Sequence, residues 1–175
     1  MTDPRRELER EIAELHLASF AWARACVGDD GDAEDVLQTT YEKIFSGRAR
    51  FEGRASLKTW LFGVIRLTAL EHRRRAWLRW LRFSPLTHEP EATSRAPNDD
   101  SESIRRALTA LPERQRQIVH LVFYEDLTVD EAAACLAISV GSARVHYDRG
   151  KKRLRELLTE SGVERQAGEA TGGTR

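Results

Sequence analysis

The sequence has few of the residues that mark covalent or cofactor chemistry. Only two of its 175 residues are cysteines, Cys26 and Cys135, and each stands in an apolar segment far from the other. We therefore expect two reduced thiols in a core and no disulfide. The five histidines are scattered and no Cys-x-x-Cys spacing occurs, so the pattern predicts no metal site and no cofactor.

Long apolar runs are also absent. No stretch approaches the roughly 20 residues needed to cross a bilayer, and the charged N-terminus lacks the apolar centre of a signal peptide. We therefore expect a cytoplasmic protein without membrane insertion. The chain has no nucleophile paired with a base, no phosphate-binding loop and no metal-ligand spacing, which argues against an enzyme.

Net charge is zero, with 28 basic and 28 acidic side chains, but the charges are unevenly distributed. Residues 1–42 carry 4 basic and 11 acidic side chains, whereas residues 43–82 carry 11 and 2. A second basic block, residues 144–155, carries 6 and 1. Any single block is typical of a solvated helix face, but two basic blocks beside helical patterns favour nucleic acid as a ligand.

Helical periodicity runs through almost the whole chain, and no β pattern exceeds a few residues. Apolar spacing predicts an amphipathic helix over residues 5–27 and a second helix that Asp32 opens and Gly47 closes. A long third helix is predicted from an N-cap at Ser56 to about Arg82. The expected fold class is all-α.

Residues 83–103 contain three prolines, several acids and small polar residues, which is the composition of a linker. We expect two small helical domains, 5–82 and 104–159, joined by this flexible acidic linker. The polar, glycine-containing residues 160–175 are expected to form a disordered tail.

The second predicted domain has the layout of a helix-turn-helix. Pro112 stands at the start of one helix, Thr128 and Glu131 form a capping box for a short helix through Leu136, and Ser139 caps a basic last helix. Arginine pairs with guanine edges and lysine anchors phosphates, so this last helix suits duplex DNA. An ordinary charged hairpin is the alternative, but the cap, turn and basic face coincide.

The long helix is aromatic and basic together, with Trp60, Phe62, Trp77 and Trp80 among its arginines. Flat rings beside positive charge suit unpaired bases, which stack on aromatic side chains while phosphates meet arginine. Burial in the core is the alternative for Trp60, Phe62 and Trp77.

Two sets of motifs resemble the extracytoplasmic-function (ECF) sigma factors of the sigma-70 family. Asp32-Ala33-Glu34-Asp35-Val36-Leu37-Gln38, Phe51-x-Gly53, Ser56-Leu57-Lys58-Thr59-Trp60-Leu61 and Arg74-Arg75 resemble region 2. Ala110-Leu111-Pro112-Glu113-Arg114-Gln115-Arg116, Leu127-Thr128, Glu131-x-Ala133, Leu136-x-Ile138-Ser139-Val140-Gly141-Ser142 and Arg149 resemble region 4. The resemblance spans roughly residues 10–158, in the order expected of the family.

The resemblance implies a promoter-recognition subunit of RNA polymerase that binds the core enzyme, promoter DNA and an anti-sigma factor. Its helix over 32–45 would dock on the β′ clamp helices, and region 4 would meet the β flap. The implied core-binding residues are Asp32, Asp35, Gln38 and Tyr41. Those implied for the −10 element are Arg54, Ser56, Lys58, Trp60, Arg66, Leu67, Arg73, Arg74 and Arg75. Those implied for the −35 element are Ser142, Arg144, Val145, His146, Arg149, Lys151 and Lys152.

The chain departs from the family pattern at several of these positions. Leu67 stands where the family usually has asparagine, Ala137 where the turn usually has glycine, and His146 ends a segment that differs throughout. A stand-alone helix-turn-helix regulator is an alternative, but it leaves the first 100 residues unexplained. A sigma-mimicking adaptor that binds only an anti-sigma factor is another, and the arginine-rich segment 73–82 argues against it.

Overall fold

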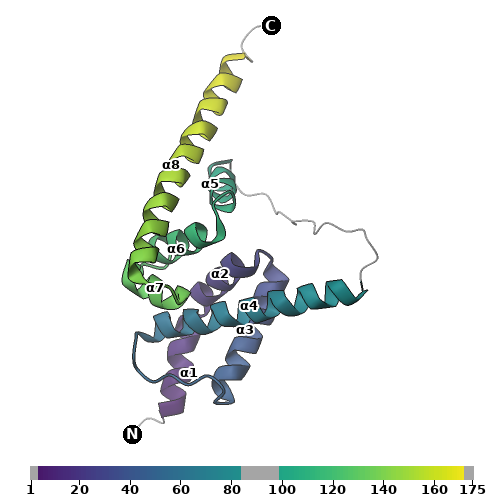
Figure 1. The fold of residues 1–175 in the computed structure, drawn as a ribbon, viewed down its shortest axis with the longest axis vertical. Coiled ribbons are helices and arrows are strands. Elements are labelled where there is room, and N and C mark those ends of the chain that lie inside the picture. The colour runs from purple at the N-terminus through teal and green to yellow at the C-terminus, as the bar shows by residue number, and fades with distance from the viewer. Residues whose placement is uncertain (1–3, 84–98, 172–175) are drawn as a thin grey trace.

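Eight α-helices and no β-strand make up the part of the chain that the structure, a computed structural model, describes: residues 4–83 and 99–171. The N-terminal half contains α1 (Pro4–Glu14), α2 (His16–Val27), α3 (Asp30–Phe45) and α4 (Leu57–Phe83). The C-terminal half contains α5 (Asp99–Thr109), α6 (Glu113–Phe123), α7 (Val129–Leu136) and α8 (Val140–Thr171) (Figure 1). The predicted all-α class is confirmed. Most of the predicted linker, residues 84–98, lies outside the described residues.

The helix predicted over residues 5–27 is two helices, α1 and α2, that meet at Leu15. The backbone N–H of Leu15 is shared between the carbonyl oxygens of Glu11 at 3.3 Å and Ile12 at 3.2 Å, so the helix tightens there. No glycine or proline marks the break, and the apolar spacing continues across it. The periodicity therefore could not reveal it.

The helix starts in this half depend on side-chain caps. Helix α3 begins at Asp30, earlier than the predicted Asp32, because the Asp29 side chain accepts a 3.0 Å hydrogen bond from the Asp32 N–H. The predicted cap of α4 is confirmed, since Ser56 Oγ accepts a 3.1 Å hydrogen bond from the Thr59 N–H. Both helices thus start where a short polar side chain satisfies a free N–H.

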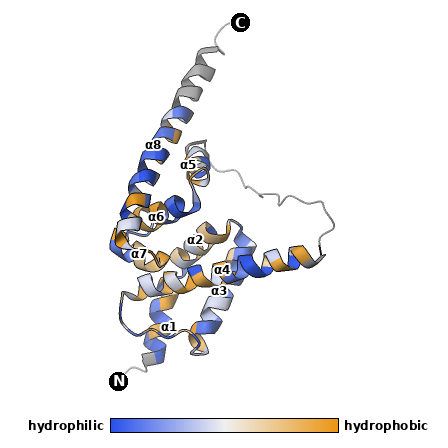
Figure 2. Ribbon diagram, in the orientation of Figure 1, coloured by the Kyte–Doolittle hydropathy of each residue, from blue (hydrophilic) through white to orange (hydrophobic). Residues whose placement is uncertain are grey.

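The core of the N-terminal half lies where α2, α3 and α4 cross. Trp22, Leu61, Phe62 and Ile65 are fully buried there, and the Trp22 Nε1–H donates a 3.0 Å hydrogen bond to the Phe62 carbonyl oxygen. Burying each such side chain stabilises the fold by about 1.5–3 kcal/mol. Figure 2 shows apolar residues in α2 and in the part of α4 beside it, and further apolar residues at the far end of α4.

The C-terminal half contains the predicted helix-turn-helix, formed by α7 and α8. The capping box is present, since Thr128 Oγ1 accepts from the Glu131 N–H at 3.2 Å and the Thr128 N–H donates to Glu131 Oε2 at 2.9 Å. Ala137 takes the left-handed turn conformation, with φ of 51°, that glycine adopts more easily. Ser139 Oγ accepts from the Ser142 N–H at 3.1 Å and caps α8 as predicted.

Two segments of the C-terminal half differ from the expectation. Residues 99–103, assigned above to the linker, begin helix α5, whose Ala107 is buried. Helix α8 continues to Thr171, so residues 160–171 are helical where a disordered tail was expected. The strong helix formers between Gly162 and Gly168 prolong a helix that is already nucleated.

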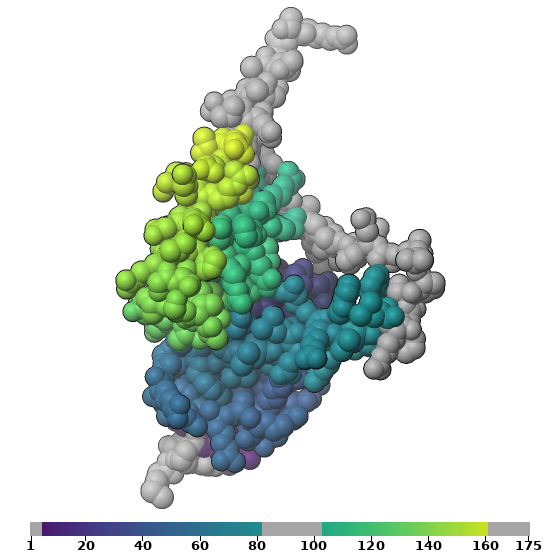
Figure 3. Space-filling model, viewed as in Figure 1, coloured from purple at the N-terminus to yellow at the C-terminus, as the bar shows by residue number. Residues whose placement is uncertain are grey.

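The two halves are in contact in this structure. Helix α4 packs against α7, and α2 packs against α6. Figure 3 shows the atoms of the C-terminal half, in green, lying directly against those of α4, in teal. The Trp22 ring stacks on the His120 ring with 5.5 Å between centroids, and the Cys135 thiol donates to the Thr59 carbonyl oxygen at 3.1 Å. Residues of both regions that are predicted to bind DNA therefore share one boundary.

We predict that Gly150→Ala destabilises the C-terminal half. A Cβ at Gly150 would lie 2.9 Å from Val119 Cγ2 and 3.3 Å from the Gln115 backbone oxygen. Overpacking of this kind costs about 1–3 kcal/mol, more than the roughly 1 kcal/mol that alanine gains over glycine in a helix. The urea unfolding midpoint should fall.

The matched control is Gly141→Ala in the same helix, where the new Cβ meets nothing within 4 Å. That change should leave the midpoint unchanged or raise it. A midpoint for Gly150→Ala at or above that of the parent would show that α6 and α8 move apart at little cost.

Candidate polymerase and nucleic-acid interfaces

The predicted core-binding residues lie along α3, but their side chains differ in exposure and in their contacts with the rest of the fold. Asp35 and Gln38 are exposed, on the side opposite the buried Val36 and Leu37. Asp32 lies 3.0 Å from His72 Nε2, in an ion pair or hydrogen bond that joins α3 to α4. The structure thus leaves Asp35 and Gln38 exposed on this surface, with Gln38 in a long 3.5 Å hydrogen bond to Glu42, and engages Asp32 within the fold.

Tyr41, the fourth predicted residue, is half-buried between α2 and α3. Its hydroxyl is hydrogen-bonded to His16 Nδ1 at 3.1 Å, and burial raises the pKa of Tyr41 above its ordinary value. The phenol therefore stays neutral at physiological pH, so Tyr41 offers a partner a ring edge and a hydroxyl but no charge.

A groove of about 860 Å³ runs between α2 and α3 beside these residues. Its lining is mostly apolar, and one member, Leu17, keeps 84 % of its surface in water. Sequence analysis did not single out Leu17, Phe20 and Phe45, which line the groove with Gln38 and Tyr41. The only available signal was an apolar residue, Leu17, lying off the buried face of its helix.

The loop before α4 and the first turns of α4 hold the next group of predicted residues. Arg54 is exposed and forms a 2.9 Å ion pair with Glu52, and Ser56 serves as the cap of α4. The Trp60 ring is half-buried against the Phe51 ring, with 5.3 Å between centroids. Trp60 is partly buried against the core, as its core alternative expects, and its contact with unpaired bases stays a prediction.

Further along α4, the predicted residues divide between its two faces. Leu67, Arg73, Arg74 and Arg75 are exposed, whereas Arg66 is only 5 % exposed. Burial, and then the positive charge of Arg114, lower the pKa of Arg66. Phe62 is fully buried, so for this ring the core alternative is correct.

Arg66 is an incompletely satisfied cation where the two halves meet. Its Nε is buried and has no hydrogen-bond partner within the described part of the chain. A buried arginine without a full set of acceptors is costly, because water is not there to replace them. Water would solvate the Arg66 guanidinium if the two halves separated.

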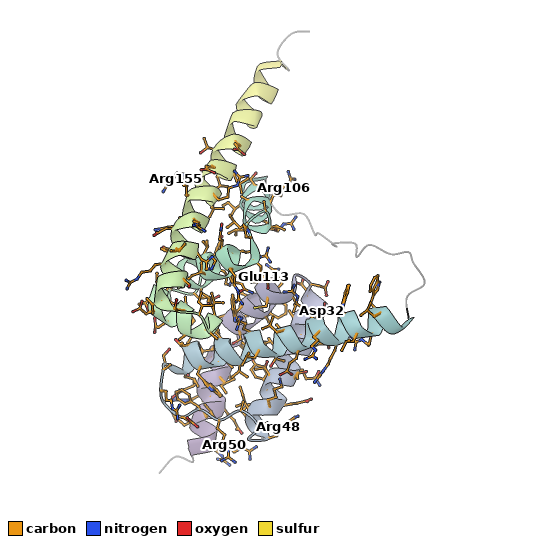
Figure 4. The ribbon with its side chains drawn as sticks, viewed as in Figure 1. Asp32, Arg48, Arg50, Arg106, Glu113 and Arg155 are labelled. Carbon is orange, nitrogen blue, oxygen red and sulfur yellow. The ribbon has the colours of Figure 1, made fainter. Side chains whose placement is uncertain are left out.

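Two acidic side chains of the C-terminal half pair with predicted DNA-binding cations. Lys58 Nζ lies 3.2 Å from Glu125 Oε2 and donates a 2.6 Å hydrogen bond to the Glu125 carbonyl oxygen. Glu125 is 5 % exposed, and His120 Nε2 lies 3.5 Å from its other carboxylate oxygen. Arg73 forms a 2.7 Å bond with Glu113, which Figure 4 places where the halves meet. Carboxylates thus hold positions that phosphates would otherwise take.

The predicted −35 residues lie on α8 and differ in how exposed their side chains are. Ser142, Arg144, Val145, Arg149 and Lys152 are exposed, and His146 is half-buried. The Arg144 guanidinium lies 3.6 Å from an Asp130 oxygen in an exposed, long ion pair. Such a pair contributes little and yields readily to a base edge.

Lys151 is half-buried and contacts neighbouring side chains of α8 itself. Its Nζ is 3.2 Å from Asp148 Oδ1 and 4.1 Å from the centroid of the Tyr147 ring. A lysine held in this way presents its charge beside the exposed face and not at its centre. Its geometry suits a phosphate better than a base edge.

One acidic cluster among the described residues is poorly suited to a metal ion, and the two thiols are poorly suited to act as nucleophiles. Asp32, Asp35 and His72 bring ligand atoms within 4.8 Å of one another, but Arg75 lines the same depression and would repel a cation. Both thiols are free and buried, and burial raises the pKa of Cys26 and of Cys135 to about 12, so neither ionises near neutral pH. We assign neither group a chemical role.

Comparison with known proteins gives the family. The Sigma-70 region 2 family matches residues 12–79, and the Sigma-70, region 4 family matches residues 101–154. The ECF RNA polymerase sigma factor SigF of Caulobacter vibrioides is 32% identical over 137 residues, covering 77% of this chain and 75% of that protein. The RNA polymerase sigma factor CarQ of Myxococcus xanthus is 34% identical over 141 residues, covering 75% and 78%.

A solved structure has the same arrangement of helices. The sigma factor RpoE of Bartonella quintana, solved in complex with the anti-sigma factor NepR, covers 88% of this chain and 98% of its own, with a TM-score of 0.75 at 25% identity. The chain belongs to the sigma-70 family of RNA polymerase sigma factors, within the ECF group. Members of this family regulate transcription and are not catalysts.

None of the helices that the structure describes is both long and apolar enough to cross a membrane.

We predict that replacing Glu113 and Glu125 together by glutamine opens the contact between the halves. Glutamine keeps the side-chain shape but removes the charge that Lys58 and Arg73 face. Losing one partner of a buried ion pair costs up to about 3–5 kcal/mol, and the partial exposure of Lys58 reduces that figure for the Lys58–Glu125 pair. The exposed Arg73–Glu113 pair contributes only about 0–1 kcal/mol. The radius of gyration measured by small-angle X-ray scattering should increase.

The control is Glu52→Gln, which removes the exposed pair with Arg54 inside the N-terminal half and should leave the scattering unchanged. If the double variant scatters like the parent, the apolar contact around Trp22 is enough to hold the halves together.

Proposed function

We propose that this sigma factor binds core polymerase through the α3 surface, opens the −10 element with the 51–56 loop and α4, and reads the −35 element with α8. The observation that supports this most strongly is the pairing of two distinct surfaces in one chain. A basic, partly aromatic helix suits unpaired DNA, and a capped helix-turn-helix suits duplex DNA. A regulator using only the helix-turn-helix has no need of the first surface.

The polymerase-binding surface is proposed to extend beyond the four predicted residues. Asp35 and Gln38 supply exposed polar groups on α3, and the groove beside them supplies apolar area at Leu17. A polar rim around an apolar centre is typical of a specific protein interface. The β′ clamp helices are the proposed partner of this surface, and the β flap is the proposed partner of the C-terminal half.

Promoter binding would require the halves to separate. The −35 and −10 positions differ by about 25 base pairs, which is roughly 85 Å of duplex at 3.4 Å per base pair. In the structure α4 and α7 touch, and three of the predicted −10 cations face the C-terminal half: Lys58, Arg66 and Arg73. We infer that the arrangement described here is the free or inhibited form and that polymerase and DNA select an open one.

An anti-sigma factor is the proposed inhibitory partner. The Bartonella quintana relative was solved bound to the anti-sigma factor NepR, and it matches nearly the whole of this chain. An inhibitor that covered Asp35, Gln38 and the adjacent groove would exclude the polymerase. Such a partner, like the polymerase, would meet the protein in the cytoplasm.

The direct test is transcription from a cognate promoter by core polymerase supplemented with this chain. We expect promoter-specific run-off transcripts that depend on the chain, and we expect Asp35→Arg to reduce both core binding and transcription. The charge-matched control is Glu160→Arg, at an exposed position of α8 far along the chain from α3. Absence of specific transcripts, with DNA binding by the chain alone, would favour a stand-alone helix-turn-helix regulator.

Within α8, we expect Arg144 to contact a base edge and Lys151 to contact phosphate. Arg144→Ala should cost holoenzyme about 1–3 kcal/mol on the preferred −35 sequence and relax specificity at one base pair. Lys151→Ala should weaken all sequences evenly and reduce the salt slope by about one unit. The measurement is a binding series against −35 variants at several salt concentrations. Uniform weakening by Arg144→Ala, with altered sequence preference for Lys151→Ala, would contradict the assignment.

A further inference from the structure

Trp77 and Trp80 form an exposed aromatic pair near the end of α4. Their side chains are 57 % and 47 % exposed, and their rings stack with centroids 5.0 Å apart and planes 23° from parallel. Packing in the core, the alternative left open for Trp77, is therefore wrong. Large rings held in water without a core contact are a common feature of binding surfaces.

The pair stands on a part of α4 that supports no core. Ala69 is the last buried residue of this helix in the described chain, and every side chain from Trp77 to Leu81 is exposed. Figure 1 shows this end of α4 projecting beyond α2 and α3. Structural demands within the described fold thus do not account for two tryptophans here.

The sequence around the tryptophan pair is rich in arginine and contains no acidic residue. No acidic residue occurs between residues 72 and 81, whereas Arg73, Arg74, Arg75 and Arg79 all lie in that segment. Arg73 and Arg74 are four and three residues before Trp77, so they are its neighbours on the helix surface. Arg73 is paired with Glu113 at 2.7 Å, and Arg75 lies 3.9 Å from Glu71. Within the described residues, Arg74 and Arg79 have no acidic partner in an ion pair.

A single-stranded nucleic acid fits this combination better than a duplex or a protein. Its phosphates match the arginines, and its unpaired bases expose flat faces that stack on aromatic rings. A duplex keeps its base faces inside its own stack and offers this surface only phosphates. An apolar protein partner would use Leu78 and Leu81 as much as the indoles and would gain nothing from the arginines.

We propose that Trp77 and Trp80 form a stacking site for unpaired bases, with Arg74 and Arg79 holding the neighbouring phosphates. The inference rests on the proposed function, which brings opened promoter DNA to α4. Trp77 lies roughly 30 Å along α4 from Leu57, so a strand that leaves the 51–56 loop must follow the helix for several nucleotides to reach it. The site therefore extends the single-strand path beyond the predicted −10 residues.

The test measures binding of the full chain to fluorescein-labelled oligothymidine of about twelve nucleotides, within the site sizes known for single-strand binders. A duplex of the same strand is the second probe. The variants are Trp77→Ala and Trp80→Ala, and the matched controls are Leu78→Ala and Leu81→Ala, which are 44 % and 56 % exposed on the same turns. Circular dichroism checks that each variant retains its helix content.

Each tryptophan variant should bind the single strand about tenfold more weakly, as expected when one base–aromatic stack is lost. Duplex affinity and both leucine controls should change less than twofold. The salt slope should stay constant, because no charge is removed. In addition, the parent's tryptophan emission should be quenched by the single strand, and each tryptophan variant should show less quenching.

Equal losses on single strand and duplex, or no loss on either, would overturn the proposal. So would leucine variants that fall as far as the tryptophan variants, since that outcome describes an apolar docking face for a protein. Each of these results leaves promoter-specific transcription by the parent chain intact. Failure of this site is therefore distinguishable from failure of the proposed function.

Discussion

The indole of Trp22 is the contact on which the rest of the molecule depends. It is fully buried, donates its only N–H to the Phe62 carbonyl oxygen, and stacks on both the Phe62 ring and the His120 ring. One side chain of α2 therefore positions α4, and through His120 it also meets α6. Because a buried indole needs a partner for its N–H, the register of α4 against α2 is set by a polar requirement as well as by packing.

The same constraint gives α4 two unequal faces. One face must bury its apolar residues against α2 and α3, so its cations collect on the remaining surface and at the boundary with the C-terminal half. There, Glu113 and Glu125 neutralise Arg73 and Lys58, while Arg66 stays buried with an unsatisfied Nε. The boundary also contains apolar contacts, because buried residues of both halves belong to one hydrophobic core. Water and phosphate can replace its ion pairs and its incompletely satisfied arginine contacts when the halves part, but not its apolar contacts. Two of the cations proposed to bind DNA are thus paired with carboxylates of the same chain.

Local features were the ones that sequence reasoning predicted well. The caps at Ser56, Thr128 and Ser139 involve side chains and N–H groups only three residues apart, so their chemistry is visible in the sequence. The exposed Asp35 and Gln38 followed from helical periodicity in the same way. The break at Leu15 was missed because no residue there interrupts the apolar spacing, and α5 was missed because acids and polar residues resemble a linker until a partner helix covers their apolar face.

The sequence by itself determined the all-α class, the helix-turn-helix and the identity of the charged groups, because these depend on neighbours within about one helical turn. Only the tertiary structure decided which of those groups are free. The bonds from Trp22 to Phe62, Lys58 to Glu125 and Cys135 to Thr59 join residues 40, 67 and 76 positions apart. Periodicity cannot predict such pairs, since it places a residue on a face without saying what covers that face. Whether a cation meets a carboxylate or remains available to DNA is therefore a property of the packed helices.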